Sequence, residues 1–419
     1  MKPDHALFRR EAARLLATLT RAFGIDNLAL AEDVVQETLA GAFEAWSYQG
    51  VPEHYAALLT TAARNRALDV FRRERTVRKF APEISRFVES EWTLRPELEA
   101  QFLPDALKDD ELRMMFTCCY PRLPEDVQVA LVLHLLCALG VDEIASAFLV
   151  SPAAIEKRLS RGKKALAASK RLFELTADDF TPRLSAVHRA LYLLFSEGYH
   201  GASWQSVVRI DLCREAMRLV RLLVDHAPAA TPATHALAAL MSLNAARLPG
   251  RIDGGGDLRP LFTQDRSMWD GELVAEGMFL LGQSAAGECV TEYHVEAGIA
   301  AQHASAGSAR ETDWTEIVRL YDVLMKIRPS PVVALNRAIA IAEAEGPGRG
   351  LAAITTIEGV ERLSRYPFYP AAVAELELRL GRPMVARGYF ERAKALARND
   401  AERRFLERRL DECTQMASS

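Results

Sequence analysis

The chain has 419 residues, 49% of them hydrophobic and 26% charged, which is the composition of a globular protein and excludes compositional disorder. Its formal net charge of −4 gives no overall basic signature for nucleic acid. The longest apolar run, residues 129–141, is too short to span a bilayer, and the N-terminus lacks the apolar core of a signal peptide.

The six cysteines include no C-x-x-C pair and form no disulfide framework. We expect the adjacent Cys118 and Cys119 to pack in a core rather than to sense redox state, because neighbouring cysteines rarely satisfy disulfide geometry. A reduced, cytoplasmic protein is therefore expected.

The first predicted elements in chain order are two helices of different charge. Apolar residues recur at helical spacing over 32–46, and again over 56–75 after a loop at 47–52. Residues 64–79 carry seven basic side chains against two acidic ones, a net charge of +5. Aromatic rings that stack on unpaired bases precede this helix, at Trp46, Tyr48, His54 and Tyr55. A single basic run is usually only a solvated helix face.

An acidic segment then leads to a second compact unit. Residues 81–111 hold nine acidic and three basic side chains, and with three prolines we expect a linker over 81–110 with at most short helices. Further helices are predicted over 124–139, 141–149 and 153–169, with Ser151 as the N-cap of the last and Pro152 at its first position. Residues 151–171 again carry a strong positive charge, +6.

The last two of these helices have the pattern of a helix-turn-helix. Ala145 is small where the short helix must pack closely, and Ile155 and Leu159 face inward on the second helix. In this motif the second helix enters the major groove, and the basic residues beyond its start bind phosphates. A helical hairpin with a basic exposed face is the alternative. Two basic runs, each attached to a helical motif, favour nucleic-acid binding.

The chain after Phe180 reads as helices punctuated by proline and glycine. The predicted ranges are 184–197, 206–226, 234–247, 272–283, 292–304, 314–327, 332–345, 370–380, 384–397 and 402–413. Toward the end a tetratricopeptide-like repeat is predicted, since one helix matches the spacing of its second helix and Gly346 lies thirty-five residues before Gly381. Plain paired helices are the alternative. The matching residues are Ala386, Phe390, Ala393 and Leu396.

The order of these motifs resembles a known family. Residues 31–37 and 58–69 resemble regions 2.1–2.4 of a bacterial RNA polymerase sigma factor of the extracytoplasmic-function group, and residues 157–163 resemble sigma region 4. The rest resembles the tetratricopeptide-like C-terminal extension of one subgroup, at 195–199, 264–270 and 329–338. The resemblance divides the chain into a region 2 domain (1–80), the linker (81–110), a region 4 domain (111–172) and the extension (180–419).

The resemblance implies roles for particular residues. Asp33, Gln36 and Glu37 would dock on the β′ clamp helices of core RNA polymerase, and region 4 would pack on its β flap. The melted −10 promoter element would be bound by Trp46, Tyr55, Asn65, Arg66, Asp69, Arg72, Arg73 and Arg75. The −35 element would be bound by Ser151, Ala154, Lys157, Arg158, Arg161, Lys163 and Lys164. Tyr55 and Glu156 depart from the family, which often has Trp and a basic residue there.

No cofactor and no metal site are predicted. His294 and His303 are nine residues apart, too far for adjacent helix turns, so with Glu296 they make a poor metal site. The glycines of 254–256 lack the following Lys-Ser/Thr of a phosphate-binding loop. A loop over 264–270 is either a ligand or regulatory site or a salt-bridged corner between helices; its candidate residues are Asp265, Arg266, Trp269 and Asp270.

We therefore expect an all-α, non-catalytic transcription initiation factor. It would recruit core RNA polymerase to a bipartite promoter and help to melt the DNA, while the extension regulates it through an intramolecular or protein contact and no membrane is involved. The rival hypothesis is a helical-repeat regulator that binds DNA and never joins polymerase. The acidic positions on the 32–46 helix discriminate, because a simple repressor has no use for them.

Overall fold

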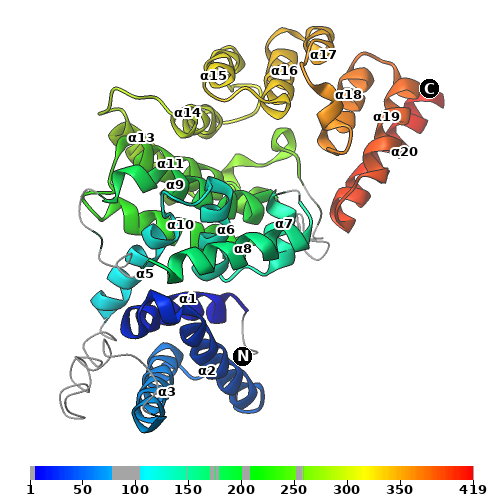
Figure 1. Cartoon of the computed structure of the whole chain (residues 1–419). Coiled ribbons are helices and arrows are strands. Elements are labelled where there is room, and N and C mark those ends of the chain that lie inside the picture. Colours follow the sequence, from blue (N-terminus) through cyan, green and yellow to red (C-terminus); the bar gives the residue numbers. More distant parts are fainter. Residues whose placement is uncertain are drawn as a thin grey trace. The chain divides into compact units, whose positions relative to one another are not determined.

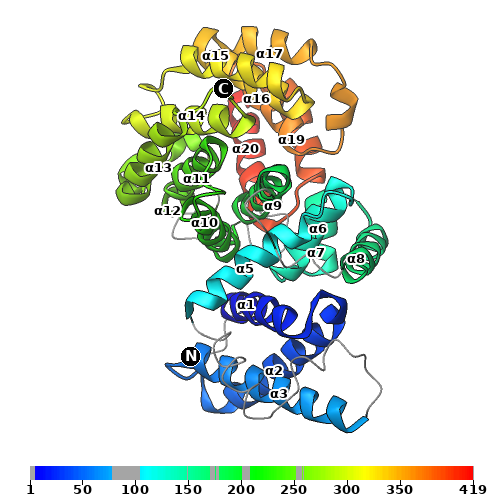
Figure 2. The same cartoon turned by 60° about the vertical axis from the view of Figure 1, so that its left-hand side comes forward.

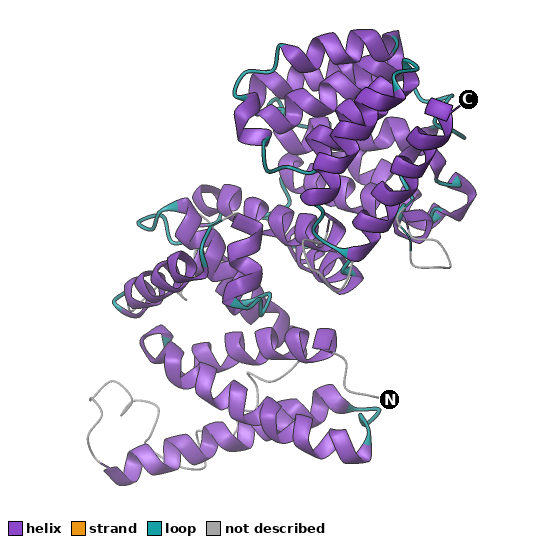
Figure 3. Ribbon diagram, turned by 90° about the vertical axis from the view of Figure 1, so that its right-hand side faces the viewer, coloured by secondary structure: helices purple, strands orange, loops and turns teal. Residues whose placement is uncertain are grey.

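The computed structural model describes residues 5–77, 104–148, 150–169, 175, 179–200, 208–251, 257 and 259–418. Within these ranges every regular element is a helix, which confirms the all-α prediction (Figure 1; Figure 3). The chain divides into two compact units, Met1–Leu194 with Asp225–Ala229, and Phe195–Val224 with Ala230–Ser419. None of the helices in the described ranges has both the length and the apolar character needed to cross a bilayer.

The first unit begins with three packed helices, α1 (His5–Phe23), α2 (Leu28–Gln49) and α3 (Tyr55–Val77). Helix α1 packs against both others (Figure 2). Its Leu15 and Leu19 are fully buried. Gly24 and Gly50 follow α1 and α2 with φ angles of 86° and 81°, a region that residues with a Cβ rarely adopt. Both helices predicted from periodicity are present, and α1 adds the face on which they pack.

Four more helices complete the part of this unit that was predicted as a helix-turn-helix domain: α5 (Pro104–Cys118), α6 (Glu125–Leu135), α7 (Val141–Phe148) and α8 (Pro152–Ala167). Helix α5 starts inside the segment expected as linker, so the last residues of that segment are helical; residues 78–103 lie outside the described ranges. Helix α6 ends four residues earlier than the predicted 139, and Ala138 has a φ angle of 47°.

A close approach of two backbones holds α8 on α6. A Cβ placed on Gly162 would lie 2.8 Å from Leu131 Cδ1 and 2.9 Å from Val127 Cγ1. A side chain at this position would therefore push α8 away from the apolar helix that supports it. The glycine in the middle of α8 is explained by this packing, although glycine weakens a helix.

Helix α9 (Thr181–His200) begins in the first unit, outside the predicted region 4 domain. The Phe180 ring packs edge-on against Phe116 of α5, with 4.5 Å between ring centroids. Arg183 Nη1 donates a hydrogen bond to the carbonyl oxygen of Phe116 at 3.1 Å. The start of α9 thus belongs to the core of the first unit.

The second unit is a succession of helices in which chain neighbours pack on one another (Figure 1). After the end of α9 it contains α10 (Ile210–Val224), α11 (Pro232–Ala245), α12 (Leu248–Arg251), α13 (Gly271–Ser284), α14 (Glu292–Ser305), α15 (Trp314–Ile327), α16 (Pro331–Glu345), α17 (Pro347–Thr355), α18 (Phe368–Arg379), α19 (Pro383–Ala395) and α20 (Asp400–Ser418). The predicted helices are all found here, whereas α12 and α17 had not been predicted.

Two helical hairpins of this unit are joined by glycines thirty-five positions apart. Gly346 lies between α16 and α17 with a φ angle of 99°, and Gly381 lies between α18 and α19 with a φ angle of 72°. Phe390 of α19 is 1% exposed and packs in one cluster with Ala374 of α18. This packing agrees with a tetratricopeptide-like hairpin over α18 and α19, and the repeat itself remains a proposal.

Candidate nucleic-acid interface

Helix α2 exposes the acidic face predicted to dock on polymerase. The side chains of Asp33, Gln36 and Glu37 are exposed, whereas Val34 and Val35 are buried against the rest of the unit. The positions i, i+3 and i+4 share one side of a helix, so the three polar side chains form one continuous surface.

Helices α2 and α3 are linked by an ion pair between two predicted site residues. Arg66 Nη1 lies 2.8 Å from Glu37 Oε2, with 41% and 68% of the two side chains exposed. Exposed pairs of this kind contribute at most about 1 kcal/mol. Asn65 and Asp69 lie on α3 with exposed side chains. Arg72, Arg73 and Arg75 follow on the last turns of α3, and their side chains fall outside the described part of the structure.

The aromatic residues ahead of α3 differ in their access to solvent. Trp46 is only 7% exposed, and its ring centroid lies 5.5 Å from that of Phe8. Tyr48 is 89% exposed, and Tyr55 is half-buried. In this conformation Tyr48 has an exposed ring face on which a base can stack, whereas Trp46 exposes little of its ring. Trp46 falls on the apolar stripe of its helix, which is the sequence signal for its burial.

Helices α7 and α8 are the two predicted helices of the helix-turn-helix. Ile144 and Ala145 of α7 and Ile155 and Leu159 of α8 are buried. Ser151 is the N-cap of α8, but its side chain makes no capping hydrogen bond to the helix. The amide groups of the first turn therefore keep their capacity to bind an anion.

The predicted −35 residues separate into an exposed set and a paired set. Arg158 Nε lies 2.9 Å from Asp126 Oδ2, and its guanidinium lies 5.5 Å from the Phe148 ring centroid. Lys163 Nζ lies 2.5 Å from Glu32 Oε1. Ala154 is half-buried; the exposed members are Ser151, Lys157, Arg161 and Lys164.

The pair between Lys163 and Glu32 is one of several that join α1 and α2 to the helices after the linker. Arg9 Nη2 lies 2.9 Å from Glu143 Oε1, and Arg21 Nη1 lies 2.8 Å from Asp110 Oδ1. The Asp110 side chain is fully buried; burial raises its pKa, while the bond from Arg21 opposes that rise. These contacts hold the two predicted sigma domains together within the first unit.

His134 of α6 lies beside the same pair, with Nε2 3.8 Å from Glu32 Oε1. Burial lowers the pKa of His134, and the positive charge of Lys163 lowers it further. Cys118 and Cys119 are fully buried, and their burial raises both thiol pKa values far from the thiolate range. In the described ranges no three His, Cys, Asp or Glu residues are grouped to hold a metal ion.

The loop over 264–270 makes the contacts of a corner between helices. Asp265 Oδ1 accepts a hydrogen bond from the Ser267 amide, and Asp270 Oδ1 accepts from the amides of Glu272 and Leu273 in the first turn of α13. Arg266 donates to the backbone oxygens of His303 and Ala306 at 2.7 Å and to Thr312 Oγ1 at 2.8 Å. Trp269 is 9% exposed. These bonds tie the loop to the end of α14 and the start of α15.

His294 and His303, weighed above as metal ligands, have other surroundings. The Thr291 amide donates to His294 Nδ1 at 3.1 Å, which caps the start of α14. His303 is buried, and its ring packs edge-on against Trp314 at 5.2 Å. Both imidazoles are thus used in holding α14 in place.

Comparison with known proteins adds family matches to this geometry. Residues 7–77 match Sigma-70 region 2, residues 113–166 match Sigma-70, region 4, and residues 183–285 match a family of unknown function (DUF6596). An uncharacterized protein of Rhizobium meliloti (strain 1021) is 39% identical over 388 residues, which are 92% of this chain and 90% of that protein. No solved structure matches the chain.

Proposed function

The chain belongs to the sigma-70 family, with region 2, region 4 and a helical C-terminal extension, and from that membership we propose that it binds core RNA polymerase and directs it to promoters read at −10 and −35 elements. The two regions support a role in transcription initiation. The observation that carries the finer proposal is their joint presence with an exposed acidic face on α2 and an exposed basic face on α8.

We assign polymerase docking to the surface formed by Asp33, Gln36 and Glu37 on α2. These side chains are exposed and lie on one side of the helix, away from the buried Val34 and Val35. By the family resemblance the partner is the β′ clamp. The rival hypothesis, a regulator that never joins polymerase, leaves this surface and the region 2 match without a role.

We assign the −10 element to α3 and the loop before it. Asn65 offers both a donor and an acceptor to a base edge, and Arg66 and the arginines after Val70 supply charge for phosphates. Tyr48 is the best exposed aromatic ring for an unstacked base. The ion pair from Glu37 holds Arg66 between the two helices, so polymerase docking and −10 binding share a residue contact.

We assign the −35 element to α8. Lys157 is exposed in the first half of the helix, where a helix-turn-helix reads bases. Arg161 is exposed one turn later, among the basic residues that would bind phosphates. Lys164 is one turn further along and is also exposed. Glu156 lies on the same exposed stretch. A carboxylate at this position can accept a hydrogen bond from a cytosine amino group but cannot pair with a phosphate.

The described arrangement of the first unit is a closed form. Lys163 of the −35 surface is paired with Glu32, and Arg9 of α1 is paired with Glu143 of α7. Because −10 and −35 elements lie apart along the duplex, region 2 and region 4 must separate when both are bound. We propose that docking on polymerase opens these contacts.

We propose that the extension regulates this opening. A restraint of about 1–3 kcal/mol would change promoter occupancy five- to 150-fold. A truncation that tests it must end after Leu194 rather than at the predicted start of the extension, residue 180, because Phe180 and Arg183 complete the core around Phe116. The regulatory role would be contradicted if the truncated chain showed unchanged polymerase binding, promoter opening and transcript yield.

The experiment for the proposal as a whole is co-elution with core RNA polymerase followed by transcription on promoter DNA. A sigma factor co-elutes with core enzyme and gives transcripts with a defined start. A chain that binds DNA yet neither co-elutes nor supports initiation would instead fit the DNA-binding regulator.

A further inference from the structure

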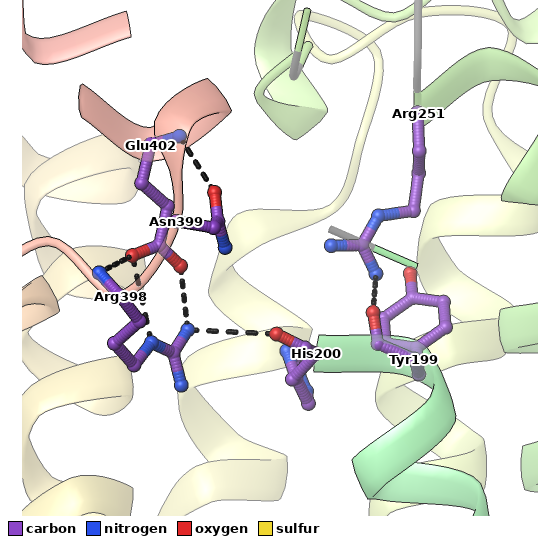
Figure 4. Close-up of polar contacts among 6 residues, drawn as sticks. All are labelled: Tyr199, His200, Arg251, Arg398, Asn399 and Glu402. Carbon is purple, nitrogen blue, oxygen red and sulfur yellow. Dashed lines mark hydrogen bonds and ion pairs between the residues drawn. The ribbon is translucent and has the colours of Figure 1, made fainter. Parts of the chain in front are cut away.

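Arginines gather around two aromatic rings in the second unit, outside every surface assigned so far. The guanidinium carbons of Arg247 and Arg266 lie 5.3 Å and 5.2 Å from the centre of the Trp269 ring. The guanidinium of Arg251 lies 3.9 Å from the centre of the Tyr199 ring. Figure 4 shows Arg251 beside Tyr199, with Arg398 approaching His200 from the other side.

Three of these arginines have partners for their charge or their N–H groups. Arg398 Nη2 lies 2.7 Å from Glu402 Oε1 (Figure 4). Arg251 Nη1 donates to the carbonyl oxygen of Tyr199 at 2.8 Å (Figure 4). Arg266 donates to two backbone oxygens and a threonine hydroxyl, and Glu311 acts on its charge.

Arg247 is different, because no described carboxylate lies within ion-pair distance of it and its guanidinium makes no hydrogen bond within the described residues. Its Nε atom is buried without a partner, and so are Arg266 Nε, Trp269 Nε1 and His303 Nδ1. Burial lowers the pKa of Arg247, and the nearby charge of Arg251 acts in the same direction. Burial and the charges of Arg247 and Arg266 lower the pKa of His303 to about 3.

Around Arg247 the described residues supply no carboxylate within ion-pair distance, and Arg251 and Arg266 add further positive charge. A partly buried cation is costly unless it is paired and hydrogen-bonded, and like charges nearby add to the cost. The Trp269 ring attracts the guanidinium, but it supplies neither a counter-charge nor an acceptor in the plane of the N–H groups. A guanidinium fork matches the oxygen spacing of a carboxylate or a phosphate.

We propose that the second unit binds a small oxyanion, bearing a phosphate or a carboxylate group, at the guanidinium of Arg247, with Arg251 and Arg266 contributing positive potential. The residues of this cluster from Tyr199 to Trp269 lie within 183–285, the segment that matches a family of unknown function. The site needs neither DNA nor polymerase, so its test is independent of the proposed function.

The test uses isothermal titration calorimetry on the full-length chain at constant ionic strength, with inorganic phosphate, pyrophosphate and citrate as probes and chloride as the balancing anion. We expect saturable binding of at least one probe. A response to phosphate or pyrophosphate alone identifies a phosphate-bearing ligand, and a response to citrate alone identifies a carboxylate. The absence of saturable binding for all three overturns the proposal.

Variants locate the site. Arg247→Gln should weaken binding about tenfold or more, since it removes a charge-assisted, bidentate contact. Arg319→Gln, which changes an arginine of α15 with 72% of its side chain exposed, should bind as the parent chain does. Equal affinity of the parent chain and Arg247→Gln would overturn the assignment.

Thermal unfolding separates loss of binding from loss of fold. In chloride alone, Arg247→Gln should melt at or above the temperature of the parent chain, because it removes an unpaired charge. The saturating probe should raise the melting temperature of the parent chain and leave that of the variant unchanged. If Arg247→Gln does not fold, Arg247→Lys keeps the charge without the planar fork and should show the weakened binding; full affinity in that variant would contradict the proposal.

Discussion

Lys163 Nζ in α8 lies 2.5 Å from Glu32 Oε1 in α2, although 131 positions separate the two residues in the sequence. Lys163 belongs to the predicted −35 surface, and Glu32 is the chain neighbour of Asp33 on the predicted polymerase surface. The pair therefore joins the two regions that we propose separate on a promoter, and it gives the closed form a measurable signature.

A double-mutant cycle between Glu32→Gln and Lys163→Met should detect the interaction between these two side chains. We expect a coupling energy of about 1 kcal/mol in the free energy of unfolding of the free chain, because the two side chains are partly buried. The measurement is urea denaturation of the four proteins. In the matched cycle of Glu32→Gln with Lys157→Met, which changes an exposed lysine on α8, the effects on the unfolding free energy should be additive. Additive effects in both cycles would contradict the closed form.

Asp33→Lys should abolish association with core RNA polymerase and leave the chain folded. The side chain is exposed on α2, so the variant reverses a charge at the proposed interface without disturbing the core. Co-elution on size exclusion measures it, with circular dichroism as the check on folding. Glu53→Lys, the same reversal at an exposed loop position, should keep association. Normal co-elution of Asp33→Lys would contradict the docking assignment.

Lys157→Ala and Arg161→Ala should each flatten the dependence of promoter affinity on salt. Each removes about one phosphate contact, so the slope of log K against log salt should decrease by about 0.9. Fluorescence anisotropy with promoter DNA and the polymerase complex measures the slope. Lys326→Ala, an exposed lysine of α15, serves as the control. A slope that does not change in either α8 variant would show that α8 is not part of the DNA interface.

His188 should make the first unit less stable in acid. Burial lowers its pKa in the folded chain to about 4, below the ordinary value of 6.5. Between these pH values the unfolded chain binds the proton and the folded chain does not, so the free energy of unfolding falls as the pH falls from 6.5 toward 4. The full effect is about 3 kcal/mol.

Urea denaturation at pH 4.5 and 7.5 tests this dependence. His188→Gln should reduce the difference in unfolding free energy between the two pH values, because it removes the group that takes up the proton. A variant with the same pH dependence as the parent chain would show that His188 does not cause it.

Periodicity predicted the helices well because their apolar stripes are regular, as in α3 and α8. It missed α1, and it missed α5, whose first residues lie in the segment expected as linker. It also missed α17, since the sequence Gly346-Pro347-Gly348 reads as a turn, whereas Pro347 takes the first position of a helix. It ran α6 on to residue 139, because the apolar run continues through Ala138, whose positive φ angle interrupts the helix. The local pattern fixes where a helix is favoured and leaves its end to tertiary packing.

The exposed site residues were predictable in the same way, since the polar positions of α2 and α8 lie opposite their apolar stripes. Which of them are paired was not predictable: the bonds of Lys163 to Glu32 and of Arg66 to Glu37 depend on how helices meet in space. Arg247, which has no ion-pair partner among the described residues, shows the same limit. Its isolation follows from burial next to Trp269, and no spacing in the sequence marks it.

We propose that this chain makes core RNA polymerase promoter-specific. The most direct measurement reconstitutes purified core enzyme with the chain on genomic DNA fragments and maps the 5′ ends of the transcripts. We predict defined starts that need the chain, that share sequence elements at −10 and −35, and that disappear with Asp33→Lys. Transcripts that are the same with and without the chain, while the chain alone binds DNA, would contradict the proposed function.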